Sequence, residues 1–170
     1  NFTATNTTTD VFESNQAWYD LGLAVSTTNA NEVYTGCLNV WRSLNGGTSF
    51  SKRSNWSSPT SPRYTHADIH FLRYFGDKLY CGSDGGVYVS ADNSNSFTDL
   101  TASAQISQFY RIAVSKQSAS KMVGGLQDNG GHALSNNQWK NYYGADGMDT
   151  AIDPTNSNLF YGFIQNGGSL

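Results

Sequence analysis

The sequence has little charge and few residues that bend or cross-link a chain. Of its 170 residues only 14% are charged, and it has 3 prolines and 2 cysteines. Ten basic residues against 13 acidic ones give a formal charge of −3, so no basic surface is available for a phosphate backbone or an anionic membrane. No run of about 18 apolar residues occurs. These absences argue against nucleic acid binding and against membrane insertion.

The start of the chain lacks the basic and apolar regions of a signal peptide. We therefore expect either a mature chain or a piece of a longer one. Cys37 and Cys81 do not have the spacing of metal ligands. They fall on corresponding strands of the repeat described below, in registers about two residues apart, so we expect two buried free thiols rather than a disulfide. Phosphate-binding loops and dinucleotide fingerprints are also absent, and we expect no metal and no cofactor.

What the chain has instead is an abundance of small polar residues and aromatics. Ser, Thr and Asn number 21, 15 and 17, and 17 glycines accompany 4 Trp, 10 Tyr and 9 Phe. Aromatic residues favour strands, while Gly, Asn and Ser favour turns. No convincing helical periodicity occurs, and one weak stretch lies near residues 100–106. The composition predicts an all-β fold of many short strands.

One pattern recurs at the spacing of a propeller blade, about 40–50 residues. Its markers are Gly36, Gly82, Gly125 and Gly162, which are 46, 43 and 37 residues apart. Each marker glycine belongs to a short apolar segment. A second apolar segment precedes it, and the link between the two is often rich in turn residues. We expect these two segments to be paired strands, and the first strands of the four pairs are residues 21–25, 69–72, 111–114 and 149–152.

A turn motif follows the third strand of the first two units. SLNGGTSF (residues 43–50) and SADNSNSF (residues 90–97) correspond position for position, and SNNQW (residues 135–139) is a reduced copy. The Asn or Asp accepts hydrogen bonds from nearby amides, the small residue tolerates a positive φ, and the Phe anchors the hairpin. The residues expected to shape these turns are Ser43, Asn45, Gly47, Phe50, Ser90, Asp92 and Phe97.

These turns resemble the Asp-box hairpins (BNR-type repeats) of sialidase-like propellers. The repeat as a whole is similar to the large propellers of the sortilin and xyloglucan-hydrolase group, especially those exported in Bacteroidetes; the resemblance spans residues 18–168. It implies a partial β-propeller, either about four blades or an arc of a larger, seven- to ten-bladed ring. Blade units would be residues 17–62, 63–107, 108–143 and an incomplete 144–170. It also implies a secreted or cell-surface location and export by type IX secretion.

Several polar residues near the inner strands are candidates for a binding site. His66, Asp68 and His70 alternate, so in a strand they would project from one face about 6.7 Å apart. Ligands on one straight strand do not converge on a metal, so we expect these three to line the tunnel or to hydrogen-bond neighbouring blades. The full set of candidate ligand-binding residues is His66, Asp68, His70, Asp84, Gln127, Asp128, Asp146, Asp149 and Trp56.

Four of the five aspartates in this set, Asp84, Asp128, Asp146 and Asp149, lie at recurring turns, where propeller loops converge. Carboxylates there could form the acid and base of a glycoside hydrolase at about 5–10 Å separation, with Asp68 and Asp149 as the catalytic candidates. For the turn aspartates we expect a structural role instead, since Asp in Asp-Gly turns caps its own backbone. Sialidase activity is disfavoured because no three arginines occupy equivalent repeat positions. No Gly-x-Ser-x-Gly elbow accompanies the histidines.

Aromatic side chains provide a second class of candidates. Trp41 and Trp139 are expected to pack between blades. Trp56 lies in the polar loop SNWSSPTSP (residues 54–62), where a structural role and sugar stacking are equally open. N-glycosylation sequons at Asn1, Asn6 and Asn55 are treated as chance, because the resemblance is bacterial.

The leading hypothesis is a non-catalytic propeller segment that binds a glycan or a protein. The alternatives are part of a xyloglucanase-like glycoside hydrolase and a sortilin-like peptide receptor. Because the fourth unit lacks its outer strands, we expect an arc completed by the remainder of its own chain or by a surface protein complex. A small ring closed by a strand from residues 1–13 is the alternative.

Overall fold

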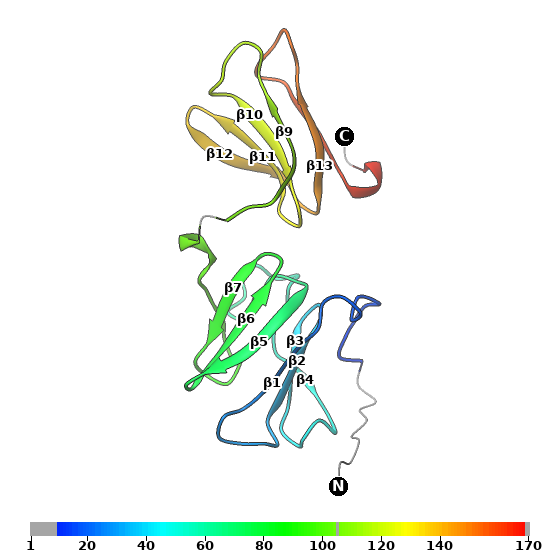
Figure 1. The fold of residues 1–170 in the computed structure, drawn as a ribbon, viewed down its shortest axis with the longest axis vertical. Helices are drawn as coiled ribbons and strands as arrows, with labels where there is room; N and C mark the ends of the chain where they lie inside the picture. Colours follow the sequence, from blue (N-terminus) through cyan, green and yellow to red (C-terminus); the bar gives the residue numbers. More distant parts are fainter. Residues whose placement is uncertain (1–9, 105, 169–170) are drawn as a thin grey trace. The chain divides into compact units, whose positions relative to one another are not determined.

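The computed structural model describes residues 10–104 and 106–168, and they form an all-β protein (Figure 1). The strands group into two compact units, residues 1–105 and residues 106–170, which are described separately. The first unit contains two four-stranded antiparallel sheets, each a meander in chain order. Their strands are β1 (Gly22–Val25), β2 (Val33–Gly36), β3 (Val40–Ser43) and β4 (Ser51–Lys52), then β5 (Ile69–Phe75), β6 (Lys78–Ser83), β7 (Gly86–Ser90) and β8 (Thr98–Asp99).

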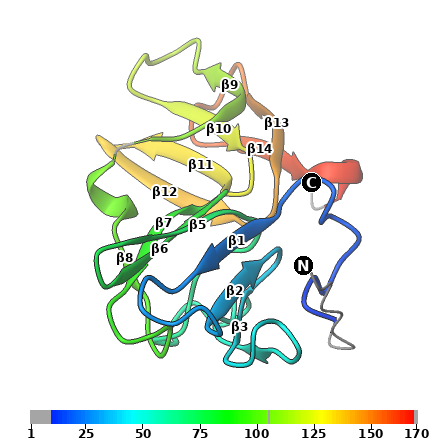
Figure 2. The same ribbon diagram turned by 60° about the horizontal axis from the view of Figure 1, so that its bottom comes forward.

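The second unit contains one four-stranded meander and one two-stranded sheet, β13–β14 (Figure 2). The described residues form no α-helix but contain two short 3-10 helices, η1 (Thr101–Ser103) and η2 (Gln165–Gly167). The weak helical stretch near residues 100–106 therefore forms only the single turn η1. The strands are β9 (Phe109–Val114), β10 (Met122–Leu126), β11 (Gly130–Ser135), β12 (Gln138–Tyr143), β13 (Gly147–Ile152) and β14 (Phe160–Ile164).

Each of the four-stranded sheets has the form of a propeller blade. A blade is a four-stranded antiparallel meander that buries its faces against its neighbours. Within the first unit β1 and β2 pack against β5, and within the second unit β9 and β10 pack against β13. The predicted all-β class is confirmed, and a partial propeller fits the fold.

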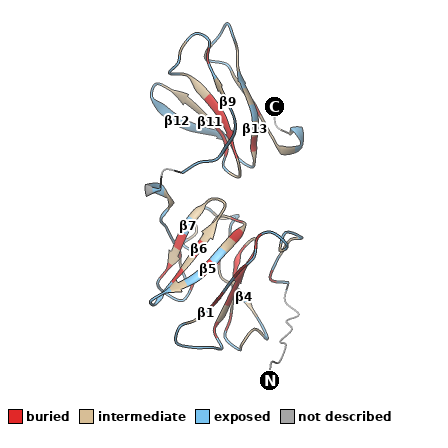
Figure 3. Ribbon diagram, viewed as in Figure 1, coloured by how far each residue is buried: buried red, intermediate tan, exposed pale blue. Residues whose placement is uncertain are grey.

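Side chains from both blades of the first unit form its core. The buried cluster includes Tyr34, Val40, Ile69, Leu79 and Tyr88. Buried residues alternate with more exposed ones along β1 and at the start of β6, and Figure 3 shows the buried segments of these strands. The core of the second unit is smaller, with Val123 and Leu126 its buried large apolar side chains among the described residues. Along β1 a two-residue period separates core from surface.

Two marker glycines lie where the next blade comes closest. A Cβ atom added to Gly36 would lie 2.7 Å from Ile69 Cγ2, and one added to Gly125 would lie 2.0 Å from the carbonyl oxygen of Met148. Real side chains do not tolerate such contacts, so the close approach of neighbouring blades requires glycine at both positions. The amide of Ile69 also donates to the carbonyl of Cys37 at 2.6 Å, which ties the two blades together.

The two matching turns have matching hydrogen bonds. Oδ1 of Asn45 accepts from the amide of Ser49 at 2.9 Å, and Oδ1 of Asp92 accepts from the amide of Ser96 at 2.9 Å. The small residue has a positive φ in both, +92° at Gly47 and +62° at Ser94. The chemistry predicted for the motif is therefore present at both turns, while the Asp-box name itself remains a resemblance.

The reduced third copy is a different turn. Ser135 pairs with Gln138 across a two-residue loop, and both loop residues, Asn136 and Asn137, have positive φ. This is the pattern of a type I′ hairpin, which asparagine tolerates better than other side-chain-bearing residues. The shared Ser and aromatic residue thus do not make it a copy of the longer turns.

Both cysteines are free and buried, as predicted. Burial raises the pKa of each thiol. At Cys37 the carboxylate of Asp20 raises the pKa further, whereas a hydrogen bond with Ser14 lowers it. Thiols with raised pKa values are poor nucleophiles at neutral pH, so these two are structural.

Most of the proposed closing strand, residues 1–13, lies outside the described residues. Its described end, residues 10–13, is not a strand. The carboxylate of Glu13 nevertheless binds the first blade, since it accepts from Asn39 Nδ2 at 2.7 Å, Trp41 Nε1 at 3.1 Å and Lys52 Nζ at 2.7 Å. Among the described residues, no helix is long and apolar enough to cross a membrane.

Replacing Asp92 with Ala should lower the free energy of unfolding by on the order of 1 kcal/mol, because the turn loses its side-chain acceptor. Asp92→Asn is the matched control, since Asn45 makes the equivalent bonds in the first blade, and it should lose less than half as much. Burial opposes ionisation here, but hydrogen bonds from Ser96, Ser90 and Asn95 lower the pKa of Asp92. The difference between the wild type and Asp92→Asn should therefore vanish as the pH falls through that pKa. Urea unfolding measures both effects, and equal losses in the two variants would refute the assigned role.

Candidate functional site

The candidate site lies at one end of the first unit and begins in the turn before β1. The carbonyl of Gln16 accepts from the amides of Tyr19 and Asp20 at 2.7 and 3.1 Å, which closes the turn. Asp20 is fully buried, whereas Trp18 and Tyr19 point outward with 84% and 63% of their surface exposed. One short turn therefore presents two exposed aromatics above a buried carboxylate.

The second blade contributes Asp68, His70 and Asp84. The prediction that His66, Asp68 and His70 share one face of a strand is wrong, because β5 begins only at Ile69. Asp68 precedes the strand with a φ of +62°, and the register of β5 against β6 shifts between Ile69 and Phe71. A bulge re-aims side chains, and here it turns His70 toward Asp84.

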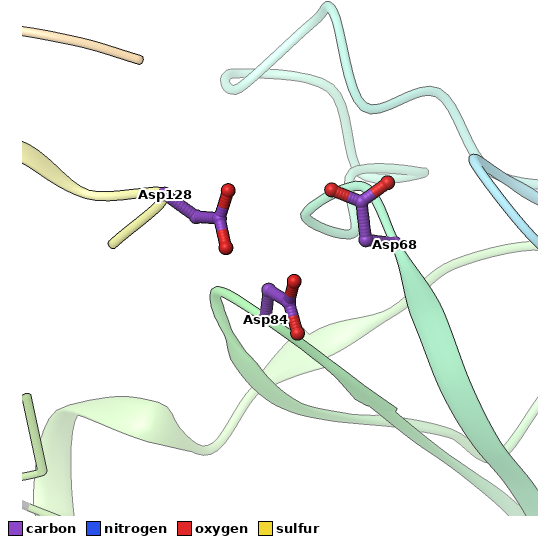
Figure 4. Close-up of side chains that lie close together, drawn as sticks. All are labelled: Asp68, Asp84 and Asp128. Carbon is purple, nitrogen blue, oxygen red and sulfur yellow. The ribbon is translucent and has the colours of Figure 1, made fainter. Parts of the chain in front are cut away.

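Three carboxylates of this unit form what we call the acidic cluster, Asp20, Asp68 and Asp84. Carboxylate oxygens of Asp68 and Asp84 lie within 4.8 Å of each other (Figure 4), and the amide of Asp84 donates to the carbonyl of Asp68 at 3.3 Å. His70 Nε2 lies 2.8 Å from Asp84 Oδ1, an ion pair when the imidazole is protonated. Figure 4 also draws Asp128, which belongs to the second unit and is described with it.

Asp68 has an unusual electrostatic environment. Burial is the main cause that raises the pKa of this carboxyl, and the carboxylates of Asp20 and Asp84 raise it further. The amide of Gln16, which donates to Asp68 Oδ1 at 2.9 Å, works in the opposite direction. The net effect is a group that holds its proton more tightly than an ordinary aspartic acid.

The aromatic pair, Trp18 and Tyr19, adjoins this cluster. Their rings lie 5.6 Å apart, and the ring of Tyr19 meets that of His70 edge-on at 5.1 Å. An exposed apolar patch rimmed by polar groups, such as this one, often marks a ligand or partner site. The pair and the cluster together combine an apolar platform with hydrogen-bonding groups.

The remaining predicted aspartates lie in the second unit. Asp128 and Asp146 lie in links between strands, whereas the prediction of a turn position is wrong for Asp149, which lies within β13. Asp146 Oδ1 accepts from the amide of Asp128 at 2.9 Å, and Asp149 Oδ1 accepts from the amide of Thr150 at 2.9 Å. Asp149 also lines a shallow cavity of about 180 Å³ with Tyr161 and Phe163. Gln127 follows β10, and its amide donates to the carbonyl of Gln108 at 3.0 Å.

Other sequence candidates have local structural contacts. His66 Nδ1 lies 3.2 Å from the carbonyl of Ala67, and its ring fills the space beside Gly85, where a Cβ would lie 2.1 Å from His66 Cγ. The amide of Trp56 donates to Asn39 Oδ1 at 2.9 Å, and 46% of its surface is exposed. Trp139 is also 46% exposed, with its ring 6.2 Å from that of Phe109.

Four residues of the site are missing from the sequence candidates: Gln16, Trp18, Tyr19 and Asp20. They precede the first strand, where the repeat has no earlier copy to compare with. The available signal was local, because two adjacent aromatics lie between a Gln and an Asp immediately before an apolar strand.

No family model matches the sequence, and no curated protein matches it significantly. Solved structures with similarity include a GH74 enzyme from Niastella koreensis, at 20% identity and a TM-score of 0.39 over 85% of this chain and 25% of that one. A GH74 xyloglucanase from Xanthomonas campestris has 16% identity and a TM-score of 0.38 over 85% and 26% of the two chains. The β-propeller domain of Cps50 (Swd1) from Myceliophteria thermophila has 6% identity and a TM-score of 0.32 over 85% and 49%. The chain thus spans about a quarter of the two GH74 proteins.

Because the folded state binds the Asp68 proton more tightly than the unfolded chain, stability should fall as the pH rises from the unfolded pKa near 4 through the raised folded pKa. In buffer with EDTA, Asp68→Asn should therefore be more stable than the wild type at pH 7, and the difference should vanish below about pH 4. Asp77→Asn, at an exposed turn of the same unit, is the control and should show no such pH-dependent gap. Urea midpoints across this range measure it, and a constant difference at all pH values would contradict the assignment.

Proposed function

We propose that this chain is a propeller segment of a secreted or cell-surface protein that binds neutral glycans without catalysis. The observation that supports it is the exposed aromatic pair, Trp18 and Tyr19, beside the polar groups of Gln16, His70 and Asp84. The C–H face of a sugar ring packs on an aromatic ring, while its hydroxyls need nearby donors and acceptors. The location is proposed from the resemblance to exported propellers.

The charge of the site narrows the class of glycan. The acidic cluster places carboxylates around the polar side of the site, and the nearest basic group described there is His70. A carboxylated or sulfated sugar would be repelled and would lose hydration without gaining a partner. Neutral β-glucans and xyloglucan are therefore the expected ligands, and polygalacturonate is not.

An apolar face elsewhere in the first unit supports the proposed partner. Leu21, Leu23 and Val25 alternate along and just before β1 and are about half or more exposed, while Gly22 and Ala24 face the second blade. Propeller blades cover such faces with a neighbouring blade. We propose that the remainder of the same chain, or a surface protein complex, covers this one.

Trp18→Ala should weaken glycan binding about tenfold or more, because a central tryptophan commonly dominates a small interface. Affinity electrophoresis of the whole chain in gels containing xyloglucan or mixed-linkage β-glucan tests this, with polygalacturonate as the anionic control. Trp56→Ala is the matched variant, an exposed tryptophan in another loop, and should bind as the wild type does. Loss of binding in Trp56→Ala instead would move the site to that loop, and no binding to either polymer would overturn the proposal.

A glycoside hydrolase is the second candidate, and the closeness of Asp68 and Asp84 favours it. Retaining enzymes place their two carboxyl groups on the order of 5 Å apart, and a raised pKa suits the general acid. In this alternative Asp68 is the acid and Asp84 the nucleophile. Reducing sugar released from the same polymers, and lost by more than a hundredfold in both Asp68→Asn and Asp84→Asn, would replace the binding-only proposal. No release above a buffer blank excludes it for these polymers.

A further inference from the structure

Two carboxylates of the acidic cluster face each other with too few donors between them. Asp20 is fully buried, and its Oδ2 receives only long contacts, from Gln16 Nε2 at 3.4 Å and from the Cys37 thiol at 3.5 Å. Its Oδ1 is buried and has no hydrogen-bond partner. The same Gln16 nitrogen donates to Asp68 Oδ1 at 2.9 Å, so one amide serves both carboxylates. Asp20 Oδ2 and Asp68 Oδ1 therefore share one donor, while the buried Oδ1 of Asp20 has none.

The positive charge needed to balance this arrangement is not supplied by side chains. Within the described residues, no Lys or Arg lies within 4 Å of a carboxylate of Asp20, Asp68 or Asp84. The basic side chain that lies within this distance is His70, and it contacts Asp84. A buried carboxylate without a partner is costly, so either a proton or a cation must belong to this site.

We propose that Asp20 and Asp68 bind a divalent cation, with Ca²⁺ as the best fit. The carboxylates of Asp20 and Asp68 would be the protein ligands, and water would complete the coordination sphere on the partly exposed side of Asp68. All donors are hard oxygens, which Ca²⁺ prefers and Zn²⁺ does not. The expectation of no metal at Asp68 rested on a straight strand that carries His66, Asp68 and His70, and it did not consider Asp20.

The proposed cation joins two blades. Asp20 ends the turn that carries the aromatic pair, and Asp68 immediately precedes β5, the inner strand of the second blade, so a bound ion ties the turn to that strand. With two carboxylate ligands the site should be weak, with a dissociation constant on the order of 0.1–1 mM, in the range of extracellular calcium modules. This inference does not depend on the proposed glycan binding, since it concerns the buried side of the turn.

Thermal unfolding of the whole chain tests it with the metal alone. In EGTA-treated protein, 10 mM CaCl₂ should raise the Tm by about 3–6 °C, and MgCl₂ should raise it less. Asp20→Asn and Asp68→Asn should each abolish the CaCl₂ shift, while Asp77→Asn, which removes one exposed carboxylate from the same unit, should retain it. Asn suits the positive φ of Asp68, so Asp68→Asn decides the matter even if Asp20→Asn does not fold.

Two results would overturn the proposal. One is an unchanged wild-type Tm in CaCl₂ at pH 7, which assigns the balancing charge to a shared proton instead. The other is an equal shift in wild type and Asp68→Asn, which shows binding elsewhere on the surface. Trp18→Ala separates this proposal from glycan binding, because it should lose the polymer and keep the calcium shift.

Discussion

The close approach of one blade to the next is the constraint on which the rest of the first unit depends. Gly36 has no side chain because Ile69 of the following blade occupies the space where one would be, and the Ile69 amide bonds to the carbonyl of Cys37. Packing at this distance encloses Tyr34, Val40 and Leu79 in a common core. It also fixes the start of β5 next to the end of β2, and that juxtaposition is what brings Asp68 to the turn that ends at Asp20.

Most of the fold could be predicted from the sequence because the fold is repetitive. Each expected inner segment proved to be a strand, and β1, β5, β9 and β13 begin within two residues of the expected starts. The Asn45 and Asp92 turns could be predicted because their hydrogen bonds are local. The hairpin at Asn136–Asn137 could not be separated from them by residue type alone, since its identity depends on two positive φ angles rather than on the shared Ser and aromatic.

The candidate site was only partly predictable, for physical reasons. Asp68, His70 and Asp84 were identified as polar residues near inner strands, but their convergence depends on a positive φ at Asp68 and a bulge in β5, and neither leaves a periodic trace in sequence. Asp20 is a buried carboxyl residue that precedes the first strand and is 48 positions from Asp68 in the sequence. Long-range pairs of this kind are set by packing, so no single-sequence pattern reports them. Trp18 was missed for the opposite reason, because exposure of a tryptophan is a property of the folded surface.

The lengths of the outer strands have a consequence for self-association. An outermost strand presents unpaired amides and carbonyls that can template pairing with another molecule, and short, charged strands limit this. In the first unit β4 and β8 contain two residues each, with Lys52 and Asp99 among them. In the second unit the outer strand β12 has six mostly exposed residues and includes Trp139 and Tyr142. Intermolecular sheet extension in concentrated solutions should therefore begin at β12, where Lys140 is the one charged residue that opposes it.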